Sequence, residues 1–128
     1  MGWFSFGKKS VSRKSFRQLD WLEIEGKLRN LDIMAKSTDQ AQTKQVIIQV
    51  DMLIDSMLKD AGIVGGTMGE RLKTLRNKAD KKTLDLLWRI HKKRNELVHD
   101  HGSFVAQWEV SKFYNDAKTA INNLRGIR

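Results

Sequence analysis

The sequence contains no cysteine and no proline in 128 residues, and it has only nine glycines. Without cysteine there is no disulfide, no thiolate metal ligand and no cysteine nucleophile, a composition compatible with a reducing cytoplasm. The absence of proline favours long uninterrupted helices over a turn-rich β fold. No apolar run approaches the ~20 residues that a membrane-spanning helix needs. We therefore expect a cytoplasmic protein made of helices.

Charge is unevenly distributed along the chain, whose formal net charge is +9. Residues 70–94 carry ten lysines and arginines against three acids, and residues 1–17 carry five basic residues and no acid. Residues 39–60 instead hold four aspartates against two lysines. A basic field concentrated in two segments attracts polyanions, nucleic acid above all. The alternative is that these lysines and arginines only solvate helix faces.

Apolar residues recur at helical spacing and predict five helices. Four of them run over about 15–35, 40–61, 81–98 and 104–124, and a short one carries Met68, Leu72 and Leu75. The glycine-rich stretch 62–69 lacks the preceding strand and the Lys-Ser/Thr ending of a phosphate-binding loop. The predicted fold is an all-α antiparallel, up-and-down helical bundle formed by residues 15–128 as a single domain.

Residues 1–14 are expected to form a flexible basic and aromatic tail. It carries Trp3, Phe4 and Phe6 ahead of several basic residues. Docking of these aromatic rings on the domain or on a partner is one interpretation, and anchoring of a membrane-peripheral adaptor is the other.

Arg94 interrupts an apolar line of the helix over 81–98. Leu87, His91, Arg94 and Val98 are spaced four, three and four residues apart and therefore share one line along that helix. Burying a guanidinium there costs several kcal/mol unless a partner compensates it, so Arg94 is either paired or reserved for a ligand. The candidate internal partners are the acids of the preceding helices, Glu23, Glu25, Asp51 and Asp55.

The segment Arg94-Asn95-Glu96-Leu97-Val98-His99 resembles the signature of the HEPN superfamily (higher eukaryotes and prokaryotes nucleotide-binding). That signature is an Arg followed by a polar residue, and then a His after a gap of four to six residues. The resemblance implies a metal-independent endoribonuclease, usually a homodimer, whose two motif copies converge in a cleft at the subunit interface. It also suggests a toxin or defence effector, with an antitoxin or another protein as a further partner.

Carried over to this chain, the resemblance assigns three catalytic residues. Arg94 would bind the scissile phosphate, His99 would act as the acid or base on the 2′-hydroxyl or the leaving oxygen, and Asn95 would orient the His99 ring. The substrate would be RNA and the products a 2′,3′-cyclic phosphate and a 5′-hydroxyl. The expected substrate-binding residues are Trp88, Arg89, Lys92, Lys93 and His101. No cofactor is expected, and the three histidines lack the carboxylate arrangement typical of a zinc site.

Two features qualify this hypothesis. Five residues of regular helix turn through about 140°, so Arg94 and His99 face different ways unless the helix ends near Val98 or a second chain completes the site. In the family branch paired with a nucleotidyltransferase antitoxin, a Tyr occupies the position of His101, so adenylylation of a tyrosine does not apply here. His91 is expected at the helix surface or in a groove. The alternative function is a catalytically inactive HEPN-like module that binds nucleic acid or a protein partner.

Overall fold

The computed structural model describes residues 14–100 and 102–127. This part of the chain forms five α-helices and a short 3-10 helix, and it contains no strand. The elements in chain order are η1 (Phe16–Gln18), α1 (Trp21–Ala35), α2 (Gln40–Asp60), α3 (Met68–Leu75), α4 (Lys81–His99) and α5 (Gln107–Arg125). The predicted all-α antiparallel bundle is confirmed. Nearly all of the predicted tail, together with His101, lies outside the described residues.

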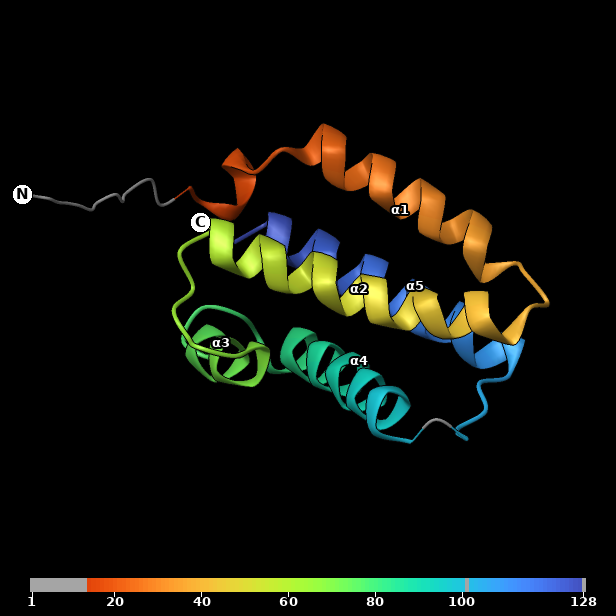
Figure 1. The fold of residues 1–128 in the computed structure, drawn as a ribbon. Helices are drawn as coiled ribbons and strands as arrows, with labels where there is room; N and C mark the ends of the chain where they lie inside the picture. The colour runs from red at the N-terminus through yellow and green to blue at the C-terminus, as the bar shows by residue number, and fades with distance from the viewer. Residues whose placement is uncertain (1–13, 101, 128) are drawn as a thin grey trace, which may run out of the picture.

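Helices α2 and α5 form the centre of the bundle (Figure 1). Helix α1 packs against both of them on one side, and α4 packs against both on the opposite side. The short helix α3 contacts α4 and α2 at the end of the bundle where α2 ends and α4 begins. Helix α4, which carries the HEPN-like motif, is therefore an outer helix with one face on the core and one face toward solvent.

The helix boundaries follow from side chains that cap or bind free backbone groups. The Asp20 carboxylate accepts a hydrogen bond from the backbone N–H of Glu23 at 3.1 Å, so α1 begins at Trp21 and not near residue 15 as expected. Similarly, the fifth helix begins at Gln107 and not at Phe104. The reason is that the Gln40 side chain binds both backbone groups of Val105, at 2.6 and 3.0 Å, which holds that residue out of the helix.

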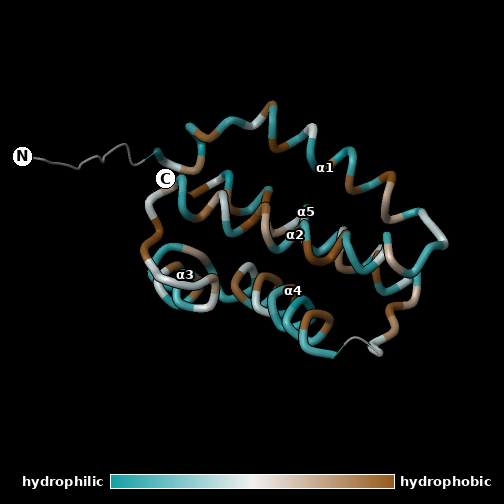
Figure 2. Tube along the Cα trace, viewed as in Figure 1, coloured by the Kyte–Doolittle hydropathy of each residue, from teal (hydrophilic) through white to brown (hydrophobic). Residues whose placement is uncertain are grey.

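Apolar residues recur about once per turn along the helices and alternate with hydrophilic ones (Figure 2). Their inward faces form one core, in which the largest fully buried side chains come from α2, α3, α4 and α5. They include Ile47, Ile54, Leu58, Leu72, Leu87, Ile90 and Ile121. Among the described residues, no helix is long and apolar enough to cross a membrane.

Candidate functional site

Arg94 lies on the side of α4 that faces α2. The apolar neighbours on its line and on the adjacent line, Leu87, Ile90 and Leu97, are buried, whereas 34% of the Arg94 side chain remains exposed. The guanidinium thus sits at the edge of the core and not within it. The apolar pattern of the sequence predicted the line of α4 on which Arg94 lies, but the guanidinium is less buried than its apolar neighbours on that face.

Asp51 is the buried acid that meets α4 at this point. It lies on α2 with only 4% of its surface exposed, and both of its carboxylate oxygens contact Nδ1 of His91, at 3.1 and 3.3 Å. The Arg94 Nε lies 3.9 Å from Asp51 Oδ2. Of the four acids considered as partners for Arg94, Asp51 is therefore the one that lies beside it, but its short contacts go to His91.

Asn95 connects the two basic side chains of this cluster. Its Oδ1 accepts a hydrogen bond from Arg94 Nη1 at 3.0 Å, and its Nδ2 lies 3.4 Å from His91 Nε2. Within the described part of the chain, Arg94 Nε is buried and has no hydrogen-bond partner. We call Asp51, His91, Arg94 and Asn95 the α2–α4 polar cluster.

His99 does not join the α2–α4 polar cluster. Helix α4 ends at His99, one residue beyond Val98 and close to the expected end, and Asp100 is its C-cap residue, so His99 itself is still helical. The His99 side chain is exposed, and it makes no hydrogen bond or ion pair with another side chain among the described residues. The amide of Asn95 binds His91 and not His99. Within one copy of the chain, regular helix geometry leaves Arg94 and His99 about 140° apart around α4.

The expected substrate-binding residues of α4 fall into two groups. Arg89 is paired with Asp116 of α5 at 3.0 Å, and Lys93 is paired with Glu96 at 3.0 Å and lies 4.0 Å from Glu109. Lys92 is exposed and has no ion pair among the described residues. The Trp88 ring is half-buried and packs edge-on against the His91 ring, with centroids 6.1 Å apart. His101 lies outside the described residues.

The environment of Asp51 determines its protonation. Burial raises the pKa of its carboxyl group above the ordinary value, and the nearby Asp55 acts in the same direction. The hydrogen bond from His91, the charge that this ring carries when it is protonated, and the positive charge of Arg94 act in the opposite direction and favour the carboxylate. The cluster thus places one buried carboxyl group under two basic side chains.

The free hydrogen-bonding capacity of Arg94 shows what this arrangement can bind. A guanidinium has five N–H donors, of which one binds Asn95 and one, on Nε, faces Asp51. No described residue accepts a hydrogen bond from Nη2. An exposed edge with free donors in a fixed plane is suited to an oxyanion such as a phosphate. Chemically, the cluster offers an anchored cation with an open side.

The chain matches no protein-family model, no curated protein and no solved structure. What the site does therefore has to follow from its own residues. The described residues contain no group of three or more histidine, cysteine, aspartate or glutamate side chains that could hold a metal ion.

Sequence reasoning named Asp51 only as one of four acids and left His91 without a role. A signal for Asp51 was present, because Ile47, Asp51, Ile54 and Leu58 are spaced four, three and four residues apart, so an acid interrupts an otherwise apolar line of α2. His91 is only 12% exposed and shares its line with Arg94. Asp51 and His91 each place a polar residue in an apolar line of a helix, and this shared feature could have predicted that they meet.

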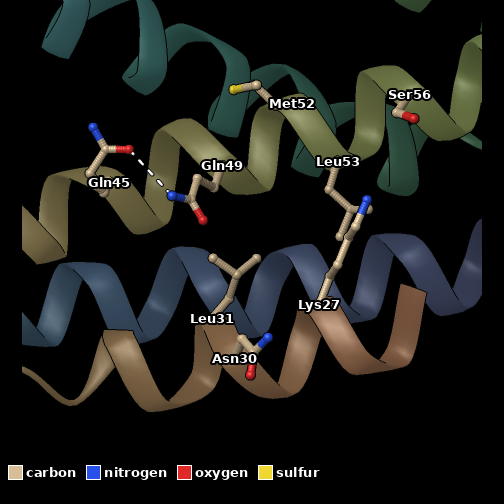
Figure 3. Close-up of a pocket in the computed structure, with 8 residues that line it drawn as sticks. All are labelled: Lys27, Asn30, Leu31, Gln45, Gln49, Met52, Leu53 and Ser56. Carbon is tan, nitrogen blue, oxygen red and sulfur yellow. Dashed lines mark hydrogen bonds between the residues drawn. The ribbon is translucent and has the colours of Figure 1, made fainter. Parts of the chain in front are cut away.

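A groove of about 640 Å³ lies elsewhere, between α1 and α2 (Figure 3). Apolar Leu31, Met52 and Leu53 line it together with polar residues of both helices, among them Lys27 and Gln49. No residue of α4 contributes to its lining, so the groove is separate from the α2–α4 polar cluster.

Proposed function

We propose that this protein is a HEPN-type, metal-independent endoribonuclease that acts as a homodimer. The observation that carries this proposal is the state of Arg94. Its guanidinium is anchored from the protein side by Asn95 and lies beside Asp51, while a third of the side chain is exposed and Nη2 has no acceptor among the described residues. An arginine held this way is organised to bind a phosphate without rearranging its own support.

The reaction we propose is transesterification within RNA. A His99 imidazole removes the proton of the ribose 2′-hydroxyl, and the 2′-oxygen forms a bond to phosphorus while the bond to the 5′-oxygen breaks. The leaving oxygen takes up a proton, which gives a 5′-hydroxyl and a 2′,3′-cyclic phosphate. Arg94 stabilises the charge that develops on the non-bridging phosphate oxygens. DNA lacks the 2′-hydroxyl and would not be cleaved.

The second copy of the chain supplies what one copy lacks in this proposal. Arg94 and His99 diverge by about 140° on a continuous helix, so one phosphate is not reached by both from the same α4. Two α4 helices related by a two-fold axis can present Arg94 of one copy and His99 of the other to the same phosphate. The dimer is therefore part of the mechanism that we propose.

The basic surface supports RNA as the substrate. Lys92 is exposed one residue after His91, and the chain carries a net charge of +9. A cytoplasmic role as a toxin or defence effector, with an antitoxin as partner, is added by family analogy alone.

A second candidate function is a catalytically inactive module that binds RNA or a protein through the same face of α4. The observation that favours it is the distance of 3.9 Å between Arg94 Nε and the buried Asp51 carboxylate, because an internal counter-charge is what a structural arginine would have. This alternative retains binding and predicts no cleavage.

Cleavage of a single-stranded RNA in EDTA distinguishes the two functions. The endoribonuclease yields 2′,3′-cyclic phosphate ends, leaves the 2′-deoxy version of the same oligonucleotide intact, and loses activity in Arg94→Ala and His99→Ala. Lys112→Ala, which removes an exposed basic residue of α5, is the matched control and should cleave as the wild type does. Binding of RNA without any cleavage by the wild type would instead support the inactive module.

A further inference from the structure

The four side chains of the α2–α4 polar cluster form a closed ring. Asp51 contacts His91, His91 contacts Asn95, Asn95 contacts Arg94, and Arg94 Nε returns to within 3.9 Å of Asp51. Three members come from successive turns or adjacent positions of α4, and the fourth comes from α2. The Trp88 side chain packs edge-on against the imidazole of His91.

In each hydrogen-bonded contact among these four side chains, only one of the two partners can be the donor. Arginine only donates, so Asn95 must turn its oxygen toward Arg94 and its NH₂ group toward His91. Because that NH₂ group donates, Nε2 of His91 must accept and carries no hydrogen. A carboxylate only accepts, so the hydrogen of the imidazole must lie on Nδ1, facing Asp51. Hydrogen bonds thus run from Arg94 to Asn95, to His91, to Asp51.

We infer that His91 is a positioning residue whose Nδ1–H tautomer, fixed by Asp51, holds the Asn95 amide in the orientation that anchors Arg94. Asn95 presents the same shape in two orientations, and only one of them offers its oxygen to Arg94. A hydrogen on Nε2 would face the Asn95 NH₂ group, and relieving this contact by turning the amide would place NH₂ against Arg94. The tautomer of the largely buried His91 imidazole therefore decides whether Arg94 keeps its hydrogen bond to Asn95.

This inference rests on the proposed function only for what the anchored Arg94 does, namely binding the scissile phosphate.

The ionisable neighbours of the His91 imidazole are few. Asp51 faces it from α2 with Asp55 behind, Arg94 lies on α4 itself, and α3 brings Gly69 to this side. Among the described residues, no other charged side chain forms a hydrogen bond or ion pair with the imidazole of His91.

The direct test is the tautomer of His91, read by ¹⁵N NMR of the histidine-labelled full-length protein above the pH at which the ring titrates. We expect a hydrogen on Nδ1 and a free Nε2. Asn95→Asp replaces the NH₂ donor by an acceptor oxygen, so the ring should retain a second proton, on Nε2, to higher pH than in the wild type. Asn122→Asp adds the same charge at an exposed position of α5 and should leave the ring unchanged. An Nε2–H tautomer in the wild type, or equal effects of the two variants, would overturn the inference.

Two substitutions of His91 separate positioning from support of the fold. His91→Asn keeps a donor for Asp51 and loses the acceptor for Asn95, whereas His91→Leu loses both. His91→Asn should remain folded and lose about tenfold in RNA cleavage, the effect of one hydrogen bond that holds the reacting group. Full activity of a folded His91→Asn would contradict positioning. A wild type that cleaves no RNA would contradict the proposed function, and the tautomer would still decide this inference.

Discussion

His91 and Asp51 connect the motif helix α4 to the central helix α2 through a partly buried contact of 3.1 Å between Nδ1 and Oδ2. The contact places a carboxylate where the apolar line of α2 would otherwise carry an aliphatic side chain. Such a carboxylate costs free energy unless its partners compensate for the lost hydration. The stability of the fold should therefore depend on the ionisation of Asp51.

The first prediction concerns the pH dependence of stability in Asp51→Asn. Burial raises the pKa of the folded-state Asp51 carboxyl group above its unfolded value of about 3.9. The contribution of Asp51 is therefore fully present below that unfolded pKa, and it is lost as the pH rises through the folded pKa, by up to about 1.4 kcal/mol per pH unit. In urea unfolding between pH 4 and 7, the free energy of unfolding of the wild type should increase relative to that of the variant as the pH falls. If the free energy of unfolding of the wild type relative to the variant stayed constant, or increased as the pH rose, the pKa of Asp51 would not be raised.

A second prediction concerns the ion pair between Arg71 of α3 and Asp55 of α2. Arg71 is only 9% exposed, donates from Nε to Asp55 Oδ1 at 2.6 Å, and also donates from Nη1 to the Gly65 carbonyl. Asp55→Ala leaves the buried guanidinium without its counter-charge and should cost about 3 kcal/mol in chemical denaturation. Lys59→Ala removes the exposed partner of the same Asp55 and should cost less than about 1 kcal/mol. Similar losses in the two variants would show that Arg71 does not need its acid.

Gly65, in the loop before α3, occupies a position that only glycine suits. A side chain at this position would meet the backbone nitrogen of Arg71 at 2.6 Å, and the φ angle of +159° disfavours other residues. The loop thus passes close to Arg71, and the Gly65 carbonyl accepts a hydrogen bond from the Arg71 guanidinium.

The third prediction concerns the hydrogen bond between α5 and α1. The Tyr114 hydroxyl donates to the Leu28 carbonyl at 2.8 Å, and burial raises the pKa of this phenol. Tyr114→Phe should lower the free energy of unfolding by about 1 kcal/mol. Thr119→Ala, which deletes an exposed hydroxyl bonded within α5, should change it by less than about 0.5 kcal/mol. If both variants lost the same free energy of unfolding, the hydrogen bond between α5 and α1 would make no contribution of its own to stability.

The fourth prediction uses the salt dependence of RNA affinity to compare two basic residues of α4. Lys92 has no acidic partner among the described residues, whereas Arg89 is bound to Asp116. If the exposed face of α4 contacts RNA phosphates, Lys92→Ala should lower the slope of log affinity against log salt by about 0.7. Arg89→Ala should lower it less. Fluorescence anisotropy of a labelled single-stranded RNA in increasing KCl measures both, and a larger effect of Arg89→Ala would place the RNA elsewhere.

Most of the fold was predictable because the helices are long, amphipathic and free of proline. The boundaries that were wrong depend on single side chains acting at a distance or in competition with helix propensity. Asp20 caps a new helix within a segment whose apolar spacing is continuous, and Gln40 holds Val105 from 65 residues away. Periodicity cannot show a contact of that range.

The candidate site was predictable in part. The interruption at Arg94 marked the right place on α4, because a charged residue in an apolar line has to be compensated. The sequence could not show which acid lies opposite, since the register of α2 against α4 is fixed only by packing. Asn95 was expected to orient His99, which follows it by four residues. His91 precedes Asn95 by four residues, and the structure has that contact instead.

The most direct test of the central claim is RNA cleavage in EDTA by an equimolar mixture of Arg94→Ala and His99→Ala, refolded together so that subunits exchange. If Arg94 of one copy and His99 of the other form one site, each variant alone is inactive, and the mixed dimer contains one intact site and recovers part of the wild-type activity. A mixture that stays as inactive as its components, beside an active wild type, would contradict a site shared between two copies.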